Sequence, residues 1–432
     1  MSELRDRSNR APKVSGVARH GRLKKSGAWK TALGLIGGTL AVALIAGASI
    51  AGIAAAQLQS NIKTTKIAAD IQGPPPNIAS FSGGFNILLV GSDTRAGQGG
   101  IGAGPGSGGA LNDVTMLMHV AQDQKSATVV SIPRDMIVPI PKCANGGGAA
   151  GLPINTTLSY GGLACTVLTV QNLTGLQIQF AGLITFLGVA AMSNAVGGVD
   201  VCVSSAISDP YTQTYLSAGV HTLSGLDALE FLRSRHGVGD GSDLGRIGSQ
   251  QVFLSALVRK IKSNDTLTNF SKLYAIAQAA TQNITLSENF THLDTLVSVA
   301  LVLKNIPLEN IVFVQYPGKT GGTGIYSGKV QPQTAIANQL FAAIKADQPI
   351  GLDANALDGA HGGSTLGTAP VGAATPTPTP TKKASSTKSA TPTPTPTATL
   401  PGAGETTPPT AVIPGLKGQS AAQYTCSAGR NG

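Results

Sequence analysis

The chain of 432 residues has few of the side chains on which nucleic-acid-binding proteins rely. Aromatic residues make up only 4% of it, which leaves few platforms for stacking bases. The formal net charge is +10, but residues 1–30 carry nine Lys/Arg, and three more lysines lie in a low-complexity stretch. The rest of the chain is close to neutral, so no basic groove remains and we expect no nucleic-acid partner.

Sequence motifs for zinc, redox cysteines and nucleotide phosphates are absent. The four cysteines show neither CxxC nor Cys/His metal spacing, and no GK[ST] follows the glycine-rich loop at 96–110. An even number of cysteines indicates disulfides in a chain that faces an oxidising compartment. Three pairings are open among the disulfide candidates Cys143, Cys165, Cys202 and Cys426.

Charge is missing altogether from residues 31–56, which are apolar or small. At about 1.5 Å per residue this run extends roughly 39 Å, enough to cross a ~30 Å hydrocarbon core. A cleavable signal peptide is the alternative, but its apolar region is usually only about 7–15 residues long. We therefore expect a signal-anchor helix at 31–56 in the cytoplasmic membrane. The basic residues 1–30 should be cytoplasmic, and everything after the helix should lie outside the cell, in the wall.

Strand-like and helix-like segments alternate after a stalk at 57–80. We expect strands at 85–90, 114–120, 127–132, 176–184, 199–203 and 311–314, and helices at 186–195, 249–261, 292–304 and 333–346. This alternation predicts an α/β fold over 81–349, a layered α-β-α domain with a mixed central sheet. The Thr/Pro-rich segment within 350–414 is expected to be a disordered linker, and 415–432 a short tail with one cysteine.

The densest cluster of charge lies at Leu229–Gln251, in a chain with only 12% charged residues. Its polar members are Arg233, Arg235, Asp240, Asp243, Arg246 and Gln250. Guanidinium groups fork onto phosphate oxygens, so three of them favour a pyrophosphate or carboxylate site. The alternative is a solvated turn with local salt bridges.

Further polar clusters lie at the ends of three predicted strands. Their members are Asp93 with Arg95, Asn112 with Asp113, and Arg134 with Asp135. Strand ends are the usual place for a site in α/β sheets. Two carboxylates from neighbouring strand ends can hold Mg²⁺ together with substrate phosphates. Ordinary turn residues and a weak, exposed ion pair are the alternatives.

In this order the clusters resemble the LytR-CpsA-Psr family of envelope phosphotransferases. The matching segments are NILLVGSDTRAG (86–97), NDVTMLMHV (112–120), SIPRDMIVPIP (131–141), INTTLSYGG (154–162), VGGVDVCV (196–203), AGVHTLSGLDALEFLRSRHG (218–237) and GDGSDLGRIGSQQ (239–251). The resemblance is dense over about 83–265 and loose to about 345.

The resemblance implies an enzyme that moves an anionic glycopolymer from a polyprenyl-pyrophosphate carrier to a peptidoglycan hydroxyl, forming a phosphodiester. It implies that Asp93 and Asp113 hold Mg²⁺ (or Mn²⁺) and form the catalytic set with Arg134 and Arg235. The pyrophosphate would be bound by Arg95, Arg134, Arg233, Arg235, Arg246 and Gln250. Asn155 and Asp243 would support these residues.

One position departs from the family pattern. The family usually has an arginine two positions before the second carboxylate, and this chain has Leu111 there, followed by Asn112 in place of a small hydroxyl residue. One pyrophosphate contact is therefore missing or supplied elsewhere. This keeps open an alternative function, a non-catalytic envelope protein that binds lipid-linked or wall polymers. Transcriptional regulation by direct DNA contact is disfavoured by the expected outside location.

Overall fold

The computed structural model describes residues 28–67, 83–94, 110–144, 146–357, 364–366 and 410–430. The chain divides into two compact units, residues 1–56 and residues 57–432. Helix α1 (Ala28–Asn61) begins in the first unit and has its last turn in the second. Its segment Ile36–Asn61 is long and apolar enough to cross a membrane, and none of its apolar window is buried inside the protein. The span expected at 31–56 thus lies within one helix that continues to Asn61.

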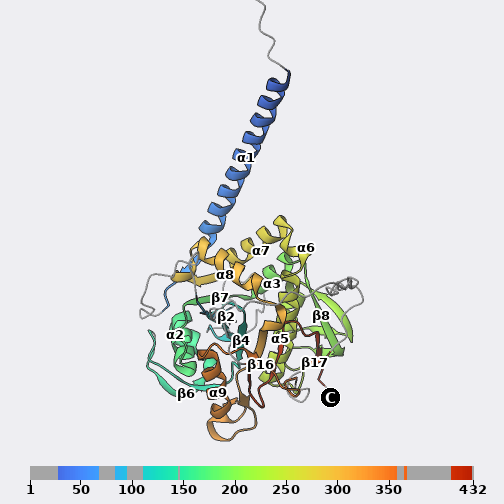
Figure 1. The fold of residues 1–432 in the computed structure, drawn as a ribbon. Helices are drawn as coiled ribbons and strands as arrows, with labels where there is room; N and C mark the ends of the chain where they lie inside the picture. Colours follow the sequence, from blue (N-terminus) through green and yellow to red (C-terminus); the bar gives the residue numbers. More distant parts are fainter. Residues whose placement is uncertain are drawn as a thin grey trace, which may run out of the picture. The chain divides into compact units, whose positions relative to one another are not determined.

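The second unit is built on a mixed sheet in the order β1-β12-β7-β2-β3-β4-β13-β19 (Figure 1). The strands are β1 (Lys63–Thr65), β2 (Phe85–Ser92), β3 (Asn112–Val120), β4 (Ala127–Ile132), β7 (Phe180–Ile184), β12 (Ile284–Ser287), β13 (Ile311–Gln315) and β19 (Gly418–Ser420). The pairs β1–β12, β2–β7 and β4–β13 are parallel, and the others are antiparallel. The predicted mixed central sheet is confirmed.

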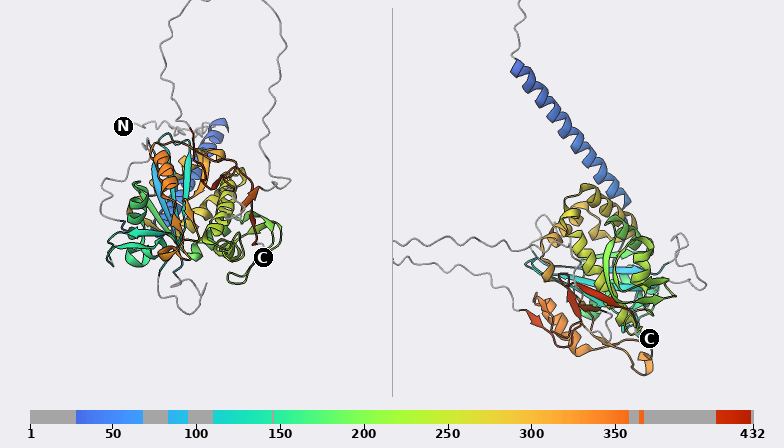
Figure 2. Two further views of the ribbon diagram at one scale, coloured as in Figure 1. Left: turned by 90° about the horizontal axis from the view of Figure 1, so that it is seen from below. Right: turned by 90° about the vertical axis from the view of Figure 1, so that its right-hand side faces the viewer.

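Helices cover both faces of this sheet, as Figure 2 shows. Alternate residues of β2 point to opposite faces, so Leu88 and Val90 enter one core and Phe85 and Ile87 another. The first core contains α2 (Thr157–Thr174) and α9 (Thr334–Lys345). The second contains α8 (Leu293–Asn305) and one side of α5 (Asp243–Ile261). The layered α-β-α prediction is therefore correct.

A smaller sheet, in the order β11-β8-β20-β17, packs against the other side of α5. Its strands are β8 (Val199–Ser205), β11 (Gly219–Leu223), β17 (Ser364–Leu366) and β20 (Thr425–Ala428). Residues 415–432, predicted as a short tail with one cysteine, contribute two strands to the sheets in the part that the structure describes. β19 adds an edge strand to the central sheet, and β20 lies between β8 and β17.

The four cysteines form two disulfides, Cys143–Cys165 and Cys202–Cys426. The second joins β8 to β20 across 224 residues of sequence, so it fixes the C-terminal strand to the second unit. Cys165 lies on α2, a helix that the sequence analysis did not predict. Helices α4 (Gly225–Arg233) and α7 (Phe270–Asn283) were likewise not predicted from the sequence.

Several predicted boundaries shift. The strand predicted at 176–184 begins only at Phe180. Before it, the Gln177 carbonyl accepts a hydrogen bond from the Asn86 side-chain amide, and the Gln179 side-chain carbonyl accepts one from the Asn86 N–H. The helix predicted at 249–261 begins six residues earlier, at Asp243, where the Ser242 hydroxyl accepts hydrogen bonds from the N–H groups of Leu244 and Gly245. Helix α3 (Phe186–Ala195) and strand β4 have the predicted bounds.

Candidate active site

The two candidate metal-binding carboxylates come from the neighbouring strands β2 and β3. Asp93 directly follows β2, where its N–H donates to the Leu111 carbonyl (2.9 Å) and its Oδ1 accepts from the Leu111 N–H (2.7 Å). The register between the strands shifts here, so that Gly91 opposes Val114 and Ser92 opposes Asn112. Asp113 is the extra residue of this β-bulge. A bulge redirects its side chain, which here lies against Arg134.

Arg134 is fixed by its backbone as well as by its side chain. It follows β4 and Pro133, and its N–H donates to Asp243 Oδ2 (2.8 Å). Its carbonyl accepts from the N–H of Asn155 (3.1 Å). Its Nη1 lies 2.5 Å from Asp113 Oδ1. The guanidinium group is thus presented from a pinned turn at the end of the sheet that also carries Asp93 and Asp113.

A buried carboxylate, Asp135, gathers three cations around it. Its Oδ1 accepts a hydrogen bond from Lys329 Nζ (3.0 Å), and its Oδ2 lies 3.5 Å from Arg235 Nη1 and 3.7 Å from Arg134 Nε. Burial alone would raise the pKa of Asp135, but Lys329, Arg134 and Arg235 together lower it. Asp135 therefore stays ionised and holds the three cations in place at neutral pH.

Carboxylates likewise keep Arg134 charged. Burial alone would lower its pKa, but Asp113, Asp243 and Asp135 raise it. Its Nε is buried and has no hydrogen-bond partner among the residues that the structure describes. The side chain of Arg134 is 24% exposed and that of Arg235 is 30% exposed, so both can still meet a ligand.

Arg246 is different, because its side chain is only 5% exposed. It lies one turn into α5, where its Nη2 is 2.6 Å from Asp243 Oδ1 and donates to the Asp113 carbonyl (2.9 Å). Arg246 therefore connects the start of α5 to the bulge that carries Asp113. Its Nε is buried and unpartnered within the described residues.

The backbone around Arg235 is held by Asp209, at the end of β9 (Ile207–Asp209). The Oδ2 of this fully buried carboxylate accepts from the Ser234 hydroxyl and from the N–H groups of Arg235, His236 and Gly237, at 2.9–3.2 Å. Burial alone would raise the pKa of Asp209, but these bonds lower it. One carboxylate thus fixes the loop that presents Arg235.

The other predicted site residues lie around this cluster or outside the description. Arg233 stacks on Phe186 of α3, with its Cζ 4.5 Å from the ring centroid. Gln250 is buried on α5 and donates to the Leu232 carbonyl at the end of α4 (3.0 Å). Asn155 touches Arg134 through its backbone. Arg95 lies outside the described residues.

One feature of the site was left open by the sequence, and two others were not predicted from it. The alternative of a weak, exposed Arg134–Asp135 ion pair does not hold, because Asp135 is 6% exposed and is shared by three cations. Lys329, which lies in a loop between β14 (Gly318–Lys319) and β15 (Gln331–Pro332), was not predicted. Asp209 was also not predicted. Neither Lys329 nor Asp209 stands in a motif with a recognisable spacing.

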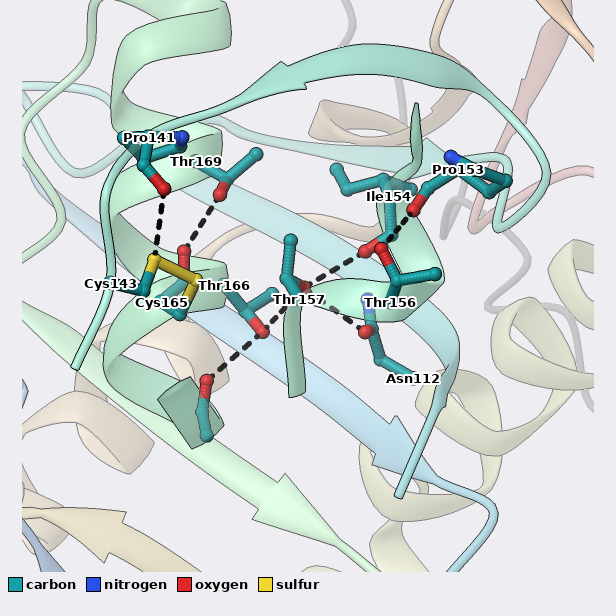
Figure 3. The surroundings of a disulfide bond; sticks show 11 residues. Asn112, Pro141, Cys143, Pro153, Ile154, Thr156, Thr157, Cys165, Thr166 and Thr169 are labelled. Atoms are coloured by element: carbon teal, nitrogen blue, oxygen red, sulfur yellow. Dashed lines mark hydrogen bonds between the residues drawn. A yellow bond between two sulfur atoms is a disulfide. The ribbon is translucent and has the colours of Figure 1, made fainter. Parts of the chain in front are cut away.

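The residue after Leu111 has a structural task. Asn112 is fully buried, and its Nδ2 donates to the Thr115 hydroxyl (2.8 Å). Its Oδ1 accepts from the hydroxyl of Thr157, which also contacts Thr166 on α2, close to the Cys143–Cys165 disulfide (Figure 3). Asn112 thus ties β3 to α2, while Leu111 uses only its backbone to bond Asp93.

Asp93 and Asp113 are the residues that would hold a magnesium ion if substrate supplied its other ligands. Among the described residues no group of three or more His, Cys, Asp or Glu is arranged to hold a metal. Mg²⁺ needs only one or two protein carboxylates when phosphate oxygens and water supply the other ligands. Asp93 and Asp113, on adjacent strands at one end of the sheet, match that requirement.

The fold and the site together define a class of protein. Its members have an α/β domain with arginines, a lysine and carboxylates at one end of the central sheet, and a helix before this domain that is long and apolar enough to cross a membrane. Within that class, the chain belongs to the LytR-CpsA-Psr family. The LytR_cpsA_psr family model matches residues 49–345, which is more than half of the chain.

Two of the relatives carry names that refer to the cell wall or its polymers. The chain is 33% identical over 290 residues to the cell wall biosynthesis protein LcpA of Corynebacterium glutamicum, covering 60% of this chain and 55% of that protein. It is 27% identical over 278 residues to the polyisoprenyl-teichoic acid–peptidoglycan teichoic acid transferase TagT of Bacillus subtilis, covering 62% and 82%. The crystal structure of B. subtilis TagV has the same fold, with a TM-score of 0.50 at 24% identity, covering 62% and 97%.

Proposed function

We propose that this protein transfers an anionic glycopolymer from a polyprenyl-pyrophosphate carrier to a hydroxyl group of peptidoglycan. The observation that carries the proposal is the gathering of Arg134, Arg235 and Lys329 around the buried Asp135, next to Asp113. A diphosphate is the kind of ligand that several fixed cations recognise. The names of the TagT and LcpA relatives, a teichoic acid transferase and a cell wall biosynthesis protein, support the same chemistry.

In the proposed reaction the acceptor hydroxyl attacks the phosphorus next to the glycopolymer. A new P–O bond forms to the peptidoglycan sugar, and the anhydride P–O bond to the prenyl-bearing phosphate breaks. Polyprenyl monophosphate leaves with that electron pair, and the proton of the acceptor passes to a base. Asp93 is our candidate for orienting or deprotonating the acceptor hydroxyl. The developing negative charge falls on oxygens that Arg134 and Arg235 can bind.

The carboxylates and the buried arginine have distinct proposed roles. Asp93 and Asp113 would hold Mg²⁺ (or Mn²⁺), which when bound supplies electrostatic stabilisation to the diphosphate oxygens. Arg246 is nearly buried, so we assign it the positioning of Asp113 and Asp243 rather than the grip on substrate. Asp243 and Asn155 would position the backbone of Arg134.

We place the second unit outside the cytoplasmic membrane, with residues 1–30 inside. Two disulfides are typical of an oxidising compartment, and the basic residues before α1 favour a cytoplasmic N-terminus. Protease added outside intact cells should then cut the Thr/Pro-rich segment within 350–414. Protection of that segment would contradict this orientation.

The transferase proposal is tested with the full-length chain in membranes, a polyprenyl-pyrophosphate-linked glycopolymer and peptidoglycan. We expect Asp93→Ala and Arg235→Ala each to abolish transfer, measured as glycopolymer phosphorus on peptidoglycan and as released polyprenyl monophosphate. Asp123→Ala, which alters an exposed turn carboxylate, should retain transfer. EDTA should stop the reaction, and added Mg²⁺ should restore it.

The rival function, binding without turnover, makes a different prediction. It is favoured by Leu111 in place of the family's usual arginine and by the carboxylate partners that Arg134 and Arg235 already have. Under that function the wild-type protein would retain the lipid-linked donor and release no polyprenyl monophosphate. Transfer that persists in both Asp93→Ala and Arg235→Ala, with the fold intact by circular dichroism, would refute the site assignment.

A further inference from the structure

Helices α7 and α8 carry large apolar side chains on the surface of the second unit. On α7, Phe270 is 71% exposed and Leu273 is 39% exposed; on α8, Val297 is 50% and Leu301 is 53% exposed. Spacings of three and four residues put each pair on one helix face. We call these four residues, with Tyr274, the α7–α8 face. Exposed apolar side chains concentrated in this way mark an interaction surface.

The two helices lie on one side of the second unit in both Figure 1 and Figure 2. The rings of Phe270 and Tyr274 stack with centroids 6.4 Å apart, so Tyr274 belongs to the same face of α7. The exposed stripe of α8 continues to Lys304, whose side chain is also exposed. The same stripe begins at the exposed Asp294, so Val297 and Leu301 lie between one anionic and one cationic side chain. An apolar surface bordered by charged side chains is typical of a segment that lies in a membrane interface.

The last turn of α1, which belongs to the second unit, is hydrogen-bonded to the same region. The Tyr274 hydroxyl donates to Gln57 Oε1 (3.2 Å), and Gln59 Nε2 donates to the carbonyl of Thr291, just before α8 (3.1 Å). Gln57 is the first amide residue after the run of apolar and small residues that ends at Ala56. Gln59 is only about 4–5 Å of helix beyond Ala56. The chain therefore contacts α7 and α8 where it would leave the hydrocarbon.

We propose that the α7–α8 face docks on the outer surface of the bilayer that α1 spans. The occupant is the lipid bilayer, because the hydrogen bonds to Gln57 and Gln59 leave no length of chain between the apolar run and this face. Lys63 and Lys66, both exposed directly after α1, match anionic lipid headgroups. Docking holds the second unit in one orientation on the membrane, independently of whether it performs the proposed transfer.

Tryptophan quenching by brominated lipid tests this docking. The chain has a single tryptophan, Trp29, so Trp29→Phe gives a background without emission from tryptophan. Into it, Phe270→Trp places a reporter on the face. Ile325→Trp places one at a 63% exposed control position, in the loop between β14 and β15 and outside α7 and α8. Ile45→Trp reports insertion of α1.

Each full-length variant is placed, one copy per nanodisc, in phosphatidylcholine and phosphatidylglycerol with or without brominated acyl chains. A single copy prevents a second molecule from covering the face. We expect brominated lipid to quench the reporters at 45 and 270 and to leave the reporter at 325 unchanged. Adding Leu301→Asp to the Phe270→Trp variant should restore its emission.

The outcomes separate docking from anchoring. Quenching at 45 without quenching at 270 would mean that α1 inserts but the face does not dock, which overturns the proposal. Equal quenching at 270 and 325 would also overturn it, because the unit would then approach the bilayer without a preferred face. Absence of quenching at 45 would refute the spanning role of α1 and, with it, the docking.

Discussion

Replacing Asp209 with asparagine should loosen the loop that presents Arg235. The carboxylate is fully buried, and its Oδ2 accepts four hydrogen bonds from residues 234–237. Its Oδ1 accepts a fifth from the N–H of Tyr211 (3.1 Å). Asparagine has the same shape as aspartate but no charge. Its NH₂ group would take the place of either Oδ1 or Oδ2, and at both positions it would face N–H groups that need an acceptor. The change therefore weakens the whole set without creating a cavity.

The expected magnitude follows from the number of bonds. A hydrogen bond to an ionised acceptor contributes about 1.5–3 kcal/mol, against about 1 kcal/mol for a neutral pair. Because the bonds share one charge, their losses do not add fully, and we expect the free energy of unfolding to fall by about 2–4 kcal/mol. At about 2 °C per kcal/mol, the unfolding midpoint should fall by about 4–8 °C.

The stability difference between wild type and Asp209→Asn should depend on pH in a predictable direction. The pKa of Asp209 is lower in the folded state, so its stabilisation is present above the unfolded pKa of about 3.9 and is lost as pH falls through the folded pKa. The difference in stability between wild type and Asp209→Asn should therefore be full at pH 7 and shrink below about pH 4. Urea unfolding of the full chain in detergent at both pH values measures it.

Asp200→Asn is the matched control, because its side chain is 48% exposed and its partners are Thr222 and, at 3.9 Å, Lys260. It should change stability by no more than about 0.5 kcal/mol. A loss below about 1 kcal/mol in Asp209→Asn, or a difference from wild type that stays constant down to pH 3, would show that the carboxylate does not brace the loop.

Three further predictions concern the packing around the site. Cys202→Ala with Cys426→Ala should lower the free energy of unfolding by about 2–5 kcal/mol in denaturant melts, and equal stability would show that the pairing strands hold β20 without the disulfide. Arg246→Met should cost about 3–5 kcal/mol, because it removes the nearer of two guanidinium groups from the buried Asp243 and leaves only Arg134 beside it; a loss under 1 kcal/mol would contradict that ion pair. Burial raises the pKa of Tyr316 to about 12, so its phenol should ionise after exposed tyrosines in an ultraviolet titration, and ionisation near pH 10 would be inconsistent with the packing.

The parts of the fold that could be predicted are those whose own sequence carries the pattern. β4 is an apolar run that is buried on both faces, and its predicted bounds are those observed. Helix α2 was not predicted, because it is rich in threonine and is kinked at Gly161 and Gly162, which have non-helical dihedral angles. The C-terminal strands β19 and β20 were not predicted for another reason. Each is only three or four residues long and pairs with a strand far away in the sequence.

The same distinction applies to the site. Asp113, Arg134, Arg235 and Arg246 stand in motifs, and the structure brings them into one network with Asp135 and Asp243. Arg233 stands in the same motif and lies over the ring of Phe186, because it is the last residue of α4, whereas Arg235 lies beyond the end of that helix. The β-bulge at Asp113 could not be predicted, since it depends on the register of two strands separated by a long loop.

The acidic partners explain how a cluster of cations can exist at the end of this sheet before any anion binds. Arg134, Arg235 and Lys329 would repel one another if they had only each other as neighbours. Asp135 lies among all three and remains ionised, because they hold its pKa low. Asp113 forms an ion pair with Arg134, and Asp243 forms one with Arg246. The folded chain therefore sets the positions of these cations, and a diphosphate would meet an arranged site rather than having to assemble one.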